Sequence, residues 1–225
     1  MMKQQTKPMT RRQFLIGAAG VTVVAGSGLA YLAARQPVIE FASASCNAPT
    51  NGSKVLVAYA SQYGSTSEVA AAVGEVFCGQ GTAVDVKSIT DIHDLTPYQS
   101  VIIGSPIQSG AWKPETVTFV ETHQAALSRV PVAYFLTCMT LGLADDTPEV
   151  RQRVAGYLDP VREQIPAVQP VDVGLFAGAL DYSKMSYAMQ GLYRAFAEND
   201  TDGDYRDWDA IRAWAAEVQP KLLAV

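Results

Sequence analysis

A Ser-rich segment directly after the first predicted strand could hold a phosphate group. Residues Val55–Ala60 form a short apolar run typical of a buried strand, and Ser67–Phe77 carries apolar residues at helical spacing. A helix N-terminus offers unpaired N–H groups and a positive dipole end, and nearby hydroxyls add further donors. The predicted phosphate-binding residues are Ser61, Gln62, Tyr63, Gly64, Ser65 and Thr66.

This segment lacks the patterns of the common nucleotide-binding loops. It contains no GK[ST], which excludes a Walker loop, and no GxGxxG, which weakens a dinucleotide assignment. Backbone and hydroxyl donors without a cationic side chain suit one terminal phosphomonoester. The alternative is a Ser-rich turn in which a hydroxyl caps the helix.

Two further loops are expected at the same edge of the sheet. The carboxyl ends of parallel strands lie together, so residues 104–112 and 137–142 would converge on the Ser-rich segment. Trp112 or Tyr63 could stack on a flat ring, although Trp112 could instead pack on the next helix. The candidate cofactor-binding residues of these two loops are Ser105, Pro106, Ile107, Gln108, Trp112, Thr137, Cys138, Met139 and Gly142.

The elements that position these loops alternate along the chain. Strands are predicted at residues 55–60, 83–86, 101–104, 130–137 and 171–180. Helices are predicted at residues 67–77, 115–127 after Pro114, 148–165 with an interruption near Pro160, 183–197 and 208–223. This alternation predicts an α/β fold with a doubly wound, five-stranded parallel sheet, in the order 2-1-3-4-5, and helices on both faces.

The charges of the chain are unevenly distributed. The 225 residues have a formal net charge of −5, but residues 1–36 carry five basic and no acidic side chains. Residues 37–225 therefore carry a formal charge of −10. A body this acidic argues against nucleic acid as a partner and against polybasic docking to anionic lipid.

Cysteine and histidine are too scarce for the usual stabilising or metal sites. Three cysteines without a CxxC pattern are too few for a disulfide scaffold or a cysteine zinc site, and two histidines are too few for a His-rich metal site. We expect no metal site. Cys138 is interpreted as a small apolar loop residue rather than a redox-active one.

The basic N-terminus has the composition of an export signal. Arg11 and Arg12 precede the uncharged run Phe14–Ala34, which predicts a twin-arginine (Tat) signal. Cleavage after Ala44 and retention of residues 14–34 as a membrane anchor are both open, and Ser43 disfavours lipidation of Cys46. The predicted organisation is a signal or anchor at 1–44, a linker at 45–53 and one domain at 54–225.

Two motifs resemble the flavodoxin family. They are Ser-x-Tyr-Gly-Ser-Thr at residues 61–66 and Gly-Ser-Pro-Ile at residues 104–107. The resemblance implies FMN as the cofactor, with its phosphate in the first loop. It also implies that the loops after the third and fourth strands flank the isoalloxazine ring.

The C-terminal part is similar to a narrower branch, the menaquinone-dependent protoporphyrinogen oxidases. The similarity rests on Ala177–Tyr182, a Met/Tyr-rich helix and the segment Asp202–Trp208. It implies a link to quinone. Members of the branch are strongly basic after the fifth strand, whereas residues 181–197 here contain only two cations. The resemblance therefore implies the flavin more strongly than it implies a porphyrinogen substrate, whose carboxylates favour more cations.

These observations predict an exported FMN oxidoreductase, located in the periplasm or on the outer face of the cytoplasmic membrane. Its partners would be a redox partner protein or a quinone, and the Tat translocon during export. No catalytic side chain is expected, because the flavin carries the redox step. The alternatives are a non-enzymatic electron carrier that docks partner proteins through its acidic surface, and a flavodoxin-like scaffold without flavin.

Overall fold

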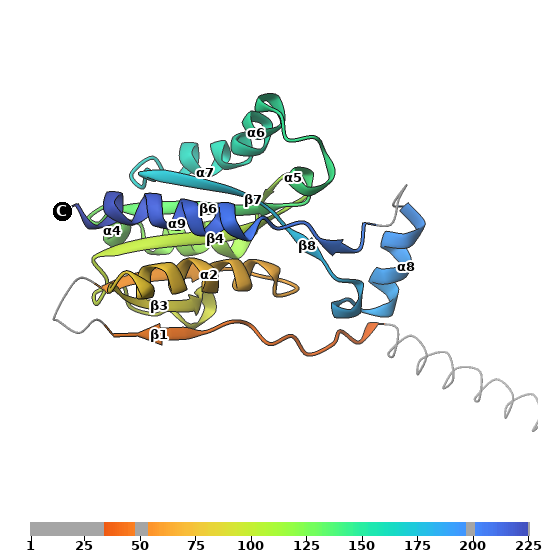
Figure 1. Ribbon diagram of the computed structural model, residues 1–225, viewed down its shortest axis with the longest axis horizontal. Coiled ribbons are helices and arrows are strands. Elements are labelled where there is room, and N and C mark those ends of the chain that lie inside the picture. Colours follow the sequence, from red (N-terminus) through yellow and green to blue (C-terminus); the bar gives the residue numbers. More distant parts are fainter. Residues whose placement is uncertain (1–33, 48–53, 197–200, 225) are drawn as a thin grey trace, which may run out of the picture. The chain divides into compact units, whose positions relative to one another are not determined.

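The computed structural model describes residues 34–47, 54–196 and 201–224 (Figure 1). The described chain divides into two compact units. The larger one contains Ile39–Asp181 together with the chain from Thr201 onward, and the smaller one contains residues 34–38 and 182–196. The predicted export signal, including Arg11 and Arg12, lies outside the described residues apart from its last part.

The larger unit is built on a parallel sheet. Its five parallel strands are β2 (Lys54–Tyr59), β3 (Ala83–Ser88), β4 (Ser100–Gln108), β6 (Val132–Cys138) and β7 (Asp172–Ala177). They pair in the order β3-β2-β4-β6-β7, which confirms the predicted order 2-1-3-4-5. Strands β2 and β6 are buried almost throughout, because helices cover both faces of the sheet.

Alternate strand residues point to opposite faces and form two separate cores. On one face, α2 (Ser65–Gly79) and α9 (Trp208–Leu223) lie side by side over β2, β4 and β6 (Figure 1). The other face carries α3 (Pro114–Thr122), α4 (Gln124–Leu127), α6 (Pro148–Ala155) and α7 (Asp159–Gln164). The short helix α5 (Thr140–Leu143) follows β6.

The helices lie where they were predicted, but the one predicted at residues 115–127 is divided into two. Pro114 is the first residue of α3, as predicted, but the helix stops before His123 and restarts as α4. The predicted helix at 148–165 is interrupted near Pro160, as expected, by a 3₁₀ turn at Gly156–Leu158. Pro160 lies in the first turn of α7, where the N–H that proline lacks has no partner within the helix.

Strand β4 is longer than expected and changes the position of a predicted loop. Ser105, Pro106, Ile107 and Gln108 continue the strand instead of forming a loop. The chain then turns through Ser109-Gly110, both left-handed (φ 51° and 78°), into β5 (Ala111–Trp112), which pairs antiparallel with β4. This two-residue turn matches the twist of a hairpin. The predicted fifth strand also breaks, into β7 and β8 (Ala179–Leu180), and β8 pairs with β9 (Gly203–Asp204).

The segment before residue 54 also differs from the prediction. Residues 44–46, of which 45 and 46 were assigned to a linker, form β1 (Ala44–Cys46), which pairs antiparallel with the edge of β3. The Tyr59 hydroxyl donates to the Ala42 carbonyl at 2.6 Å, and burial raises the pKa of Tyr59 to about 12, which keeps this donor protonated at neutral pH. Residues 42–46 are therefore folded against the sheet.

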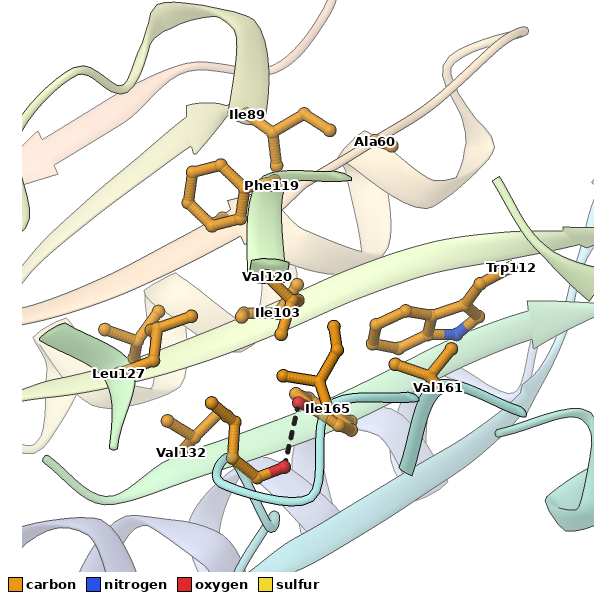
Figure 2. Close-up of a cluster of buried hydrophobic side chains, with 14 of the residues drawn as sticks. Ala60, Ile89, Ile103, Trp112, Phe119, Val120, Leu127, Val132, Val161 and Ile165 are labelled. Atoms are coloured by element: carbon orange, nitrogen blue, oxygen red, sulfur yellow. Dashed lines mark hydrogen bonds between the residues drawn. The ribbon is translucent and has the colours of Figure 1, made fainter. Parts of the chain in front are cut away.

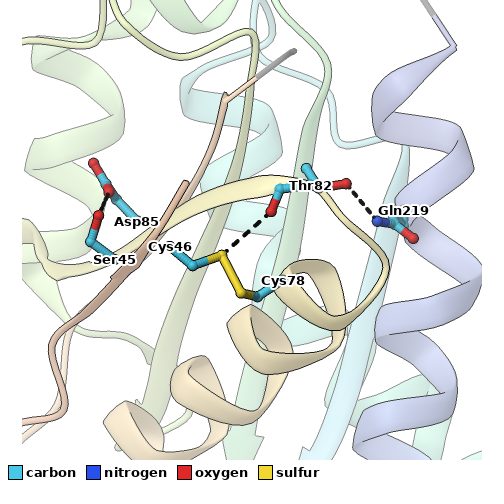
Figure 3. Close-up of a disulfide and its surroundings, with 6 residues drawn as sticks. All are labelled: Ser45, Cys46, Cys78, Thr82, Asp85 and Gln219. Carbon is cyan, nitrogen blue, oxygen red and sulfur yellow. Dashed lines mark hydrogen bonds between the residues drawn. A yellow bond between two sulfur atoms is a disulfide. The ribbon is translucent and has the colours of Figure 1, made fainter. Parts of the chain in front are cut away.

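A disulfide fastens this edge strand. It joins Cys46 to Cys78 near the end of α2, with the two Cα atoms 6.2 Å apart (Figure 3). Next to it, the Gln219 side-chain amide donates to the Thr82 hydroxyl at 2.8 Å and so links α9 to the start of β3. The number of cysteines excluded only a scaffold of several disulfides, and the spacing of the cysteines in the sequence did not predict this single pair.

The smaller unit contains a 3₁₀ turn at Tyr182–Lys184 and the helix α8 (Tyr187–Phe196). The predicted helix at 183–197 thus begins four residues later. Tyr187, Leu192 and Tyr193 of α8 are exposed, Tyr187 by 73%. Across the part of the chain that the structure describes, no helix combines the length and the apolar character needed to cross a membrane.

Candidate functional site

The Ser-rich segment forms a closed loop between β2 and α2. Gly64 is left-handed (φ 91°), a conformation that favours glycine, and its N–H donates to the Ser61 hydroxyl at 3.0 Å. Its carbonyl accepts from the Ser67 hydroxyl at 2.7 Å and from the Glu68 N–H at 3.1 Å. These bonds fix the direction in which the first turn of α2 points.

The first turn of α2 has backbone donors to spare. Over the described residues, the N–H groups of Ser65, Thr66 and Ser67 have no acceptor in the protein, and no side chain caps the helix. Three N–H groups at the positive end of a 15-residue helix form an anion site. The alternative prediction, a hydroxyl cap, is not what the structure shows.

Two hydroxyls join this loop to the end of β6. The Thr66 and Thr137 hydroxyls lie 2.9 Å apart, and both residues are buried. Thr66 was predicted to donate to the phosphate, and the structure gives its hydroxyl a protein partner. The prediction that the loops after the first and fourth strands converge is thereby supported by a direct contact.

Three side chains connect the loop to the end of β4. The Gln108 amide donates to the Gln62 side-chain oxygen, and the Gln62 amide donates to the Tyr63 hydroxyl at 3.1 Å. Tyr63 is half-buried beside the first turn of α2. It is the predicted aromatic residue whose position suits contact with a flat ring.

Trp112 does not fit its predicted role as a stacking residue. It is only 3% exposed and its ring meets Tyr134 edge-on at 4.8 Å between centroids. Figure 2 shows the indole among the buried side chains of one core cluster. The alternative, that Trp112 packs inside the protein, is the one the structure supports, because β5 turns back onto β4 and carries the indole inward.

The remaining candidates of β4 also serve the fold. Ser105 is fully buried, and its hydroxyl accepts the N–H of Lys113 at 3.1 Å, just before α3. Ile107 packs against the core cluster that contains Trp112. Pro106 is half-buried and Gln108 is exposed. Of this strand, Gln108 is therefore the residue tied to the Ser-rich loop.

The three remaining candidates, Cys138, Met139 and Gly142, lie at or just after the end of β6. Cys138 is buried and free, as expected for an apolar filler. A Cβ added to Gly142 would lie 2.5 Å from Cβ of Tyr205, so glycine is required there by close packing. Met139 is half-buried, and its sulfur would lie 3.5 Å from a Cβ added at Gly178. Helix α5 is thus in contact with the segment that follows β9.

A cation that the sequence did not predict lies at the Ser-rich loop. The Arg206 guanidinium donates to the Ser65 carbonyl at 3.0 Å and forms ion pairs with Glu68 and Asp204, both at 2.7 Å. Burial alone would lower the pKa of Arg206, but the hydrogen bonds that its guanidinium donates to Asp204 and Glu68 raise it. Ser65 and Arg206 are 141 positions apart in the sequence, so no local pattern could have predicted this contact.

Comparisons with known proteins indicate one family. The family model described as "Flavodoxin domain" matches residues 56–204. A curated relative, protoporphyrinogen IX dehydrogenase [quinone] from Leishmania major, is 27% identical over 150 residues, which are 63% of this chain and 62% of the relative. The chain thus spans less than two thirds of the length of that relative.

Similar solved structures include two flavodoxins. One comes from the domain Archaea, with 16% identity, a TM-score of 0.45, and coverage of 75% of this chain and 98% of the other. The other is oxidised flavodoxin 2 from Bacillus cereus, with 18% identity, a TM-score of 0.45, and coverage of 75% and 99%.

The site fits the phosphate end of FMN. Three unpaired backbone donors, an uncapped helix and a left-handed glycine suit a phosphomonoester, and the loops from β2, β4 and β6 meet around them. The family match covers most of the folded chain, including the Ser-rich loop and the ends of β4 and β6. The protein belongs to the flavodoxin-domain family, and its cofactor is FMN.

Proposed function

We propose that this flavoprotein is an exported, quinone-linked oxidoreductase that passes electrons from a donor to a quinone through bound FMN. The observation that carries the flavin part is the uncapped first turn of α2, joined by side chains to the ends of β4 and β6. The quinone part rests on the Leishmania relative, whose name states a quinone acceptor. FMN supplies one- and two-electron redox chemistry when bound.

The residues of the chain bind and orient the cofactor. The N–H groups of Ser65, Thr66 and Ser67 would hold the phosphate, since their donors point out of the positive end of α2. Tyr63 would cover one face of the ring, held in place by Gln62. The acidic body would disfavour an anionic reduced flavin and so lower its potential.

Helix α8 supports a hydrophobic electron acceptor. Its Tyr187, Leu192 and Tyr193 are exposed apolar side chains that a quinone tail could contact. Residues 182–196 contain only Lys184 and Arg194 as cations, and the Arg194 guanidinium lies over the Tyr182 ring, 5.4 Å from its centre. A porphyrinogen, which carries several carboxylates, would be better matched by more cations. We therefore propose a quinone link without a porphyrinogen substrate.

The disulfide supports export. Disulfides persist in oxidising compartments and are rare in the bacterial cytosol. The Cys46–Cys78 pair is thus consistent with the twin arginines at 11 and 12, which direct a folded protein to the Tat route. Residues 14–34 would hold the protein at the membrane if they are not removed.

The proposal is tested with protein purified from its native host. We expect a yellow protein with the absorption bands of oxidised flavin, and release of FMN on denaturation. A menaquinone analogue should restore the oxidised spectrum of the reduced protein within seconds. A colourless protein that cannot take up FMN would refute the flavin function.

An electron carrier is the second candidate, favoured by the formal charge of −10 on residues 37–225. A carrier would be reoxidised slowly by the menaquinone analogue and rapidly by a redox protein with a basic surface, in a reaction that slows as salt is added. The ratio of the two reoxidation rates in low salt decides between enzyme and carrier.

Export is tested separately. Replacing Arg11 and Arg12 by Lys should leave the protein in the cytoplasm, with Cys46 and Cys78 reactive toward a thiol-alkylating reagent. The wild-type protein should be found outside the cytoplasm with both cysteines protected. Unchanged export of the double variant would argue against the Tat assignment.

A further inference from the structure

One side chain of the segment after β9 contacts the Ser-rich loop between β2 and α2, called the phosphate loop below. Arg206 is 6% exposed, and Asp204 binds its guanidinium in a fork, Nε at 2.7 Å and Nη2 at 2.7 Å. The Asp204 carboxylate also accepts the Arg206 N–H at 3.1 Å. The guanidinium carbon lies 4.3 Å from the centre of the Trp208 ring. Both its plane and its position are therefore fixed.

The remaining donors of this guanidinium are directed at the first turn of α2. Nη1 donates to the Ser65 carbonyl at 3.0 Å and pairs with Glu68 at 2.7 Å. Ser65 is the first residue of α2, and its N–H is one of the three unpaired donors. Holding the Ser65 carbonyl limits rotation of the adjoining peptide groups, and a donor that is ordered before binding loses less entropy on binding.

The same contact neutralises a charge that would oppose phosphate. Glu68 is the fourth residue of α2, one turn from the donors, and its carboxylate would repel a dianionic phosphate there. Arg206 forms an ion pair with this carboxylate. Loss of the guanidinium would leave Glu68 and Asp204 negative beside the phosphate loop.

We propose that Arg206 is a positioning residue that sets the preference of this protein for FMN over riboflavin, by ordering the phosphate loop and neutralising Glu68. The inference rests on FMN binding at the loop. It adds a residue from the C-terminal segment, which does not itself need to touch the cofactor. Only a ligand that carries the phosphate should gain from it.

The test compares two flavins on the apoprotein. Quenching of flavin fluorescence gives the dissociation constants of FMN and riboflavin for wild type and for R206Q. In R206Q the FMN constant should rise about 10- to 100-fold, as expected when a charge-assisted contact is lost, whereas riboflavin should change by less than about threefold. The wild-type ratio of the two constants is the reference.

Arg212 provides a matched control. Its guanidinium lies over the same Trp208 ring at 6.0 Å, but it is half-exposed and pairs with Asp209 at 3.9 Å instead of with Ser65 and Glu68. R212Q should keep the wild-type ratio. E68Q in the R206Q background should recover part of the FMN affinity, because it removes the repulsion left behind.

A structural role alone predicts a different pattern. If Arg206 only stabilises the fold, R206Q weakens FMN and riboflavin by the same factor, and that result overturns the proposal. If R206Q does not fold, R206K is compared in its place, since it keeps the charge without the fork and should have an intermediate ratio. Wild-type protein that binds FMN, with unchanged constants in R206Q, refutes this inference alone. Wild-type protein that binds neither flavin refutes the flavin function as well.

Discussion

Two regions of the molecule, the Ser-rich loop between β2 and α2 and the β1 edge of the sheet, are each stabilised by a different kind of contact. At the loop, Thr66 meets Thr137 and Gln62 meets Gln108, through neutral hydroxyls and amides. At the edge, β1 is held by the Cys46–Cys78 disulfide and by a carboxylate among cations. Among the described residues, the loop keeps backbone N–H groups without an acceptor, which a ligand can use, whereas the polar groups at the edge are bonded to one another.

The carboxylate at the edge belongs to Asp85, whose side chain is 5% exposed. It accepts from the Ser45 and Tyr98 hydroxyls, both at 2.6 Å, and pairs with Lys54 at 2.9 Å and Lys87 at 3.2 Å. Burial alone would raise the pKa of Asp85, but these hydrogen bonds hold it well below its usual range. The comparison shows that the covalent crosslink and the buried carboxylate network lie at the β1 edge, whereas the Ser-rich loop is tied to the sheet by neutral side chains and to the C-terminal segment by the ion pairs of Arg206. We expect changes at the edge to affect stability and changes at the loop to affect flavin binding.

The largest effect on stability is expected from the disulfide. The C46S/C78S double variant should lose about 3–4 kcal/mol of unfolding free energy, because the crosslink closes a loop with a sequence separation of 32. Urea denaturation with and without reductant measures it. Wild type in reductant should match the double variant, and C138A, which removes the free thiol, should keep its response to reductant. A loss below about 1 kcal/mol would contradict a stabilising crosslink.

The second-largest effect on stability is expected from removing the charge of Asp85. D85N should lower the unfolding free energy by about 2 kcal/mol at pH 7, a value reduced from that of a fully buried pair because both lysines are partly exposed. A depressed folded-state pKa gives stability that is present above the unfolded pKa of about 4 and is lost as pH falls. The difference between wild type and D85N should therefore shrink between about pH 4 and pH 2. A difference that stays constant with pH would contradict the charge network.

The hydroxyl pair at the loop should have a smaller effect on stability and a visible one on flavin. T66V should cost about 1 kcal/mol, since it leaves the buried Thr137 hydroxyl unpaired. It should also weaken FMN binding, because the first turn of α2 loses its tie to β6. A double-mutant cycle with T137V isolates the coupling. Additive effects of the two substitutions would show that the contact carries no energy.

The smallest effect on flavin is expected at Trp112. W112F should change the FMN dissociation constant by less than about twofold and leave the position of the flavin absorption bands unchanged, because the indole lies in the core. Y63A should shift the bands and weaken FMN. Absorbance spectra of both variants make the measurement. A band shift in W112F as large as in Y63A would place Trp112 at the cofactor after all.

Local patterns predicted the five parallel strands, because strand-like runs alternate with helical segments, and the strand order followed from the doubly wound fold class that this alternation indicates. They also predicted α9 with both its bounds, since Asp207 caps the helix through the N–H groups of Asp209 and Ala210. The same patterns could not give the length of β4, because Pro106 and the polar residues around it read as a loop. Nor could they give β1, whose three residues carry almost no apolar signal.

The sequence by itself determined the fold class, the position of the Ser-rich loop between β2 and α2, and the family, because these depend on residues that are close together along the chain. The tertiary structure alone decided which aromatic residue is buried, which cysteines pair, and that Arg206 reaches Ser65. Each of these is a contact between distant segments, and it depends on how the strands turn and pack. For Trp112 the deciding feature was a two-residue turn at Ser109-Gly110, which returns β5 to β4 and carries the indole into the core.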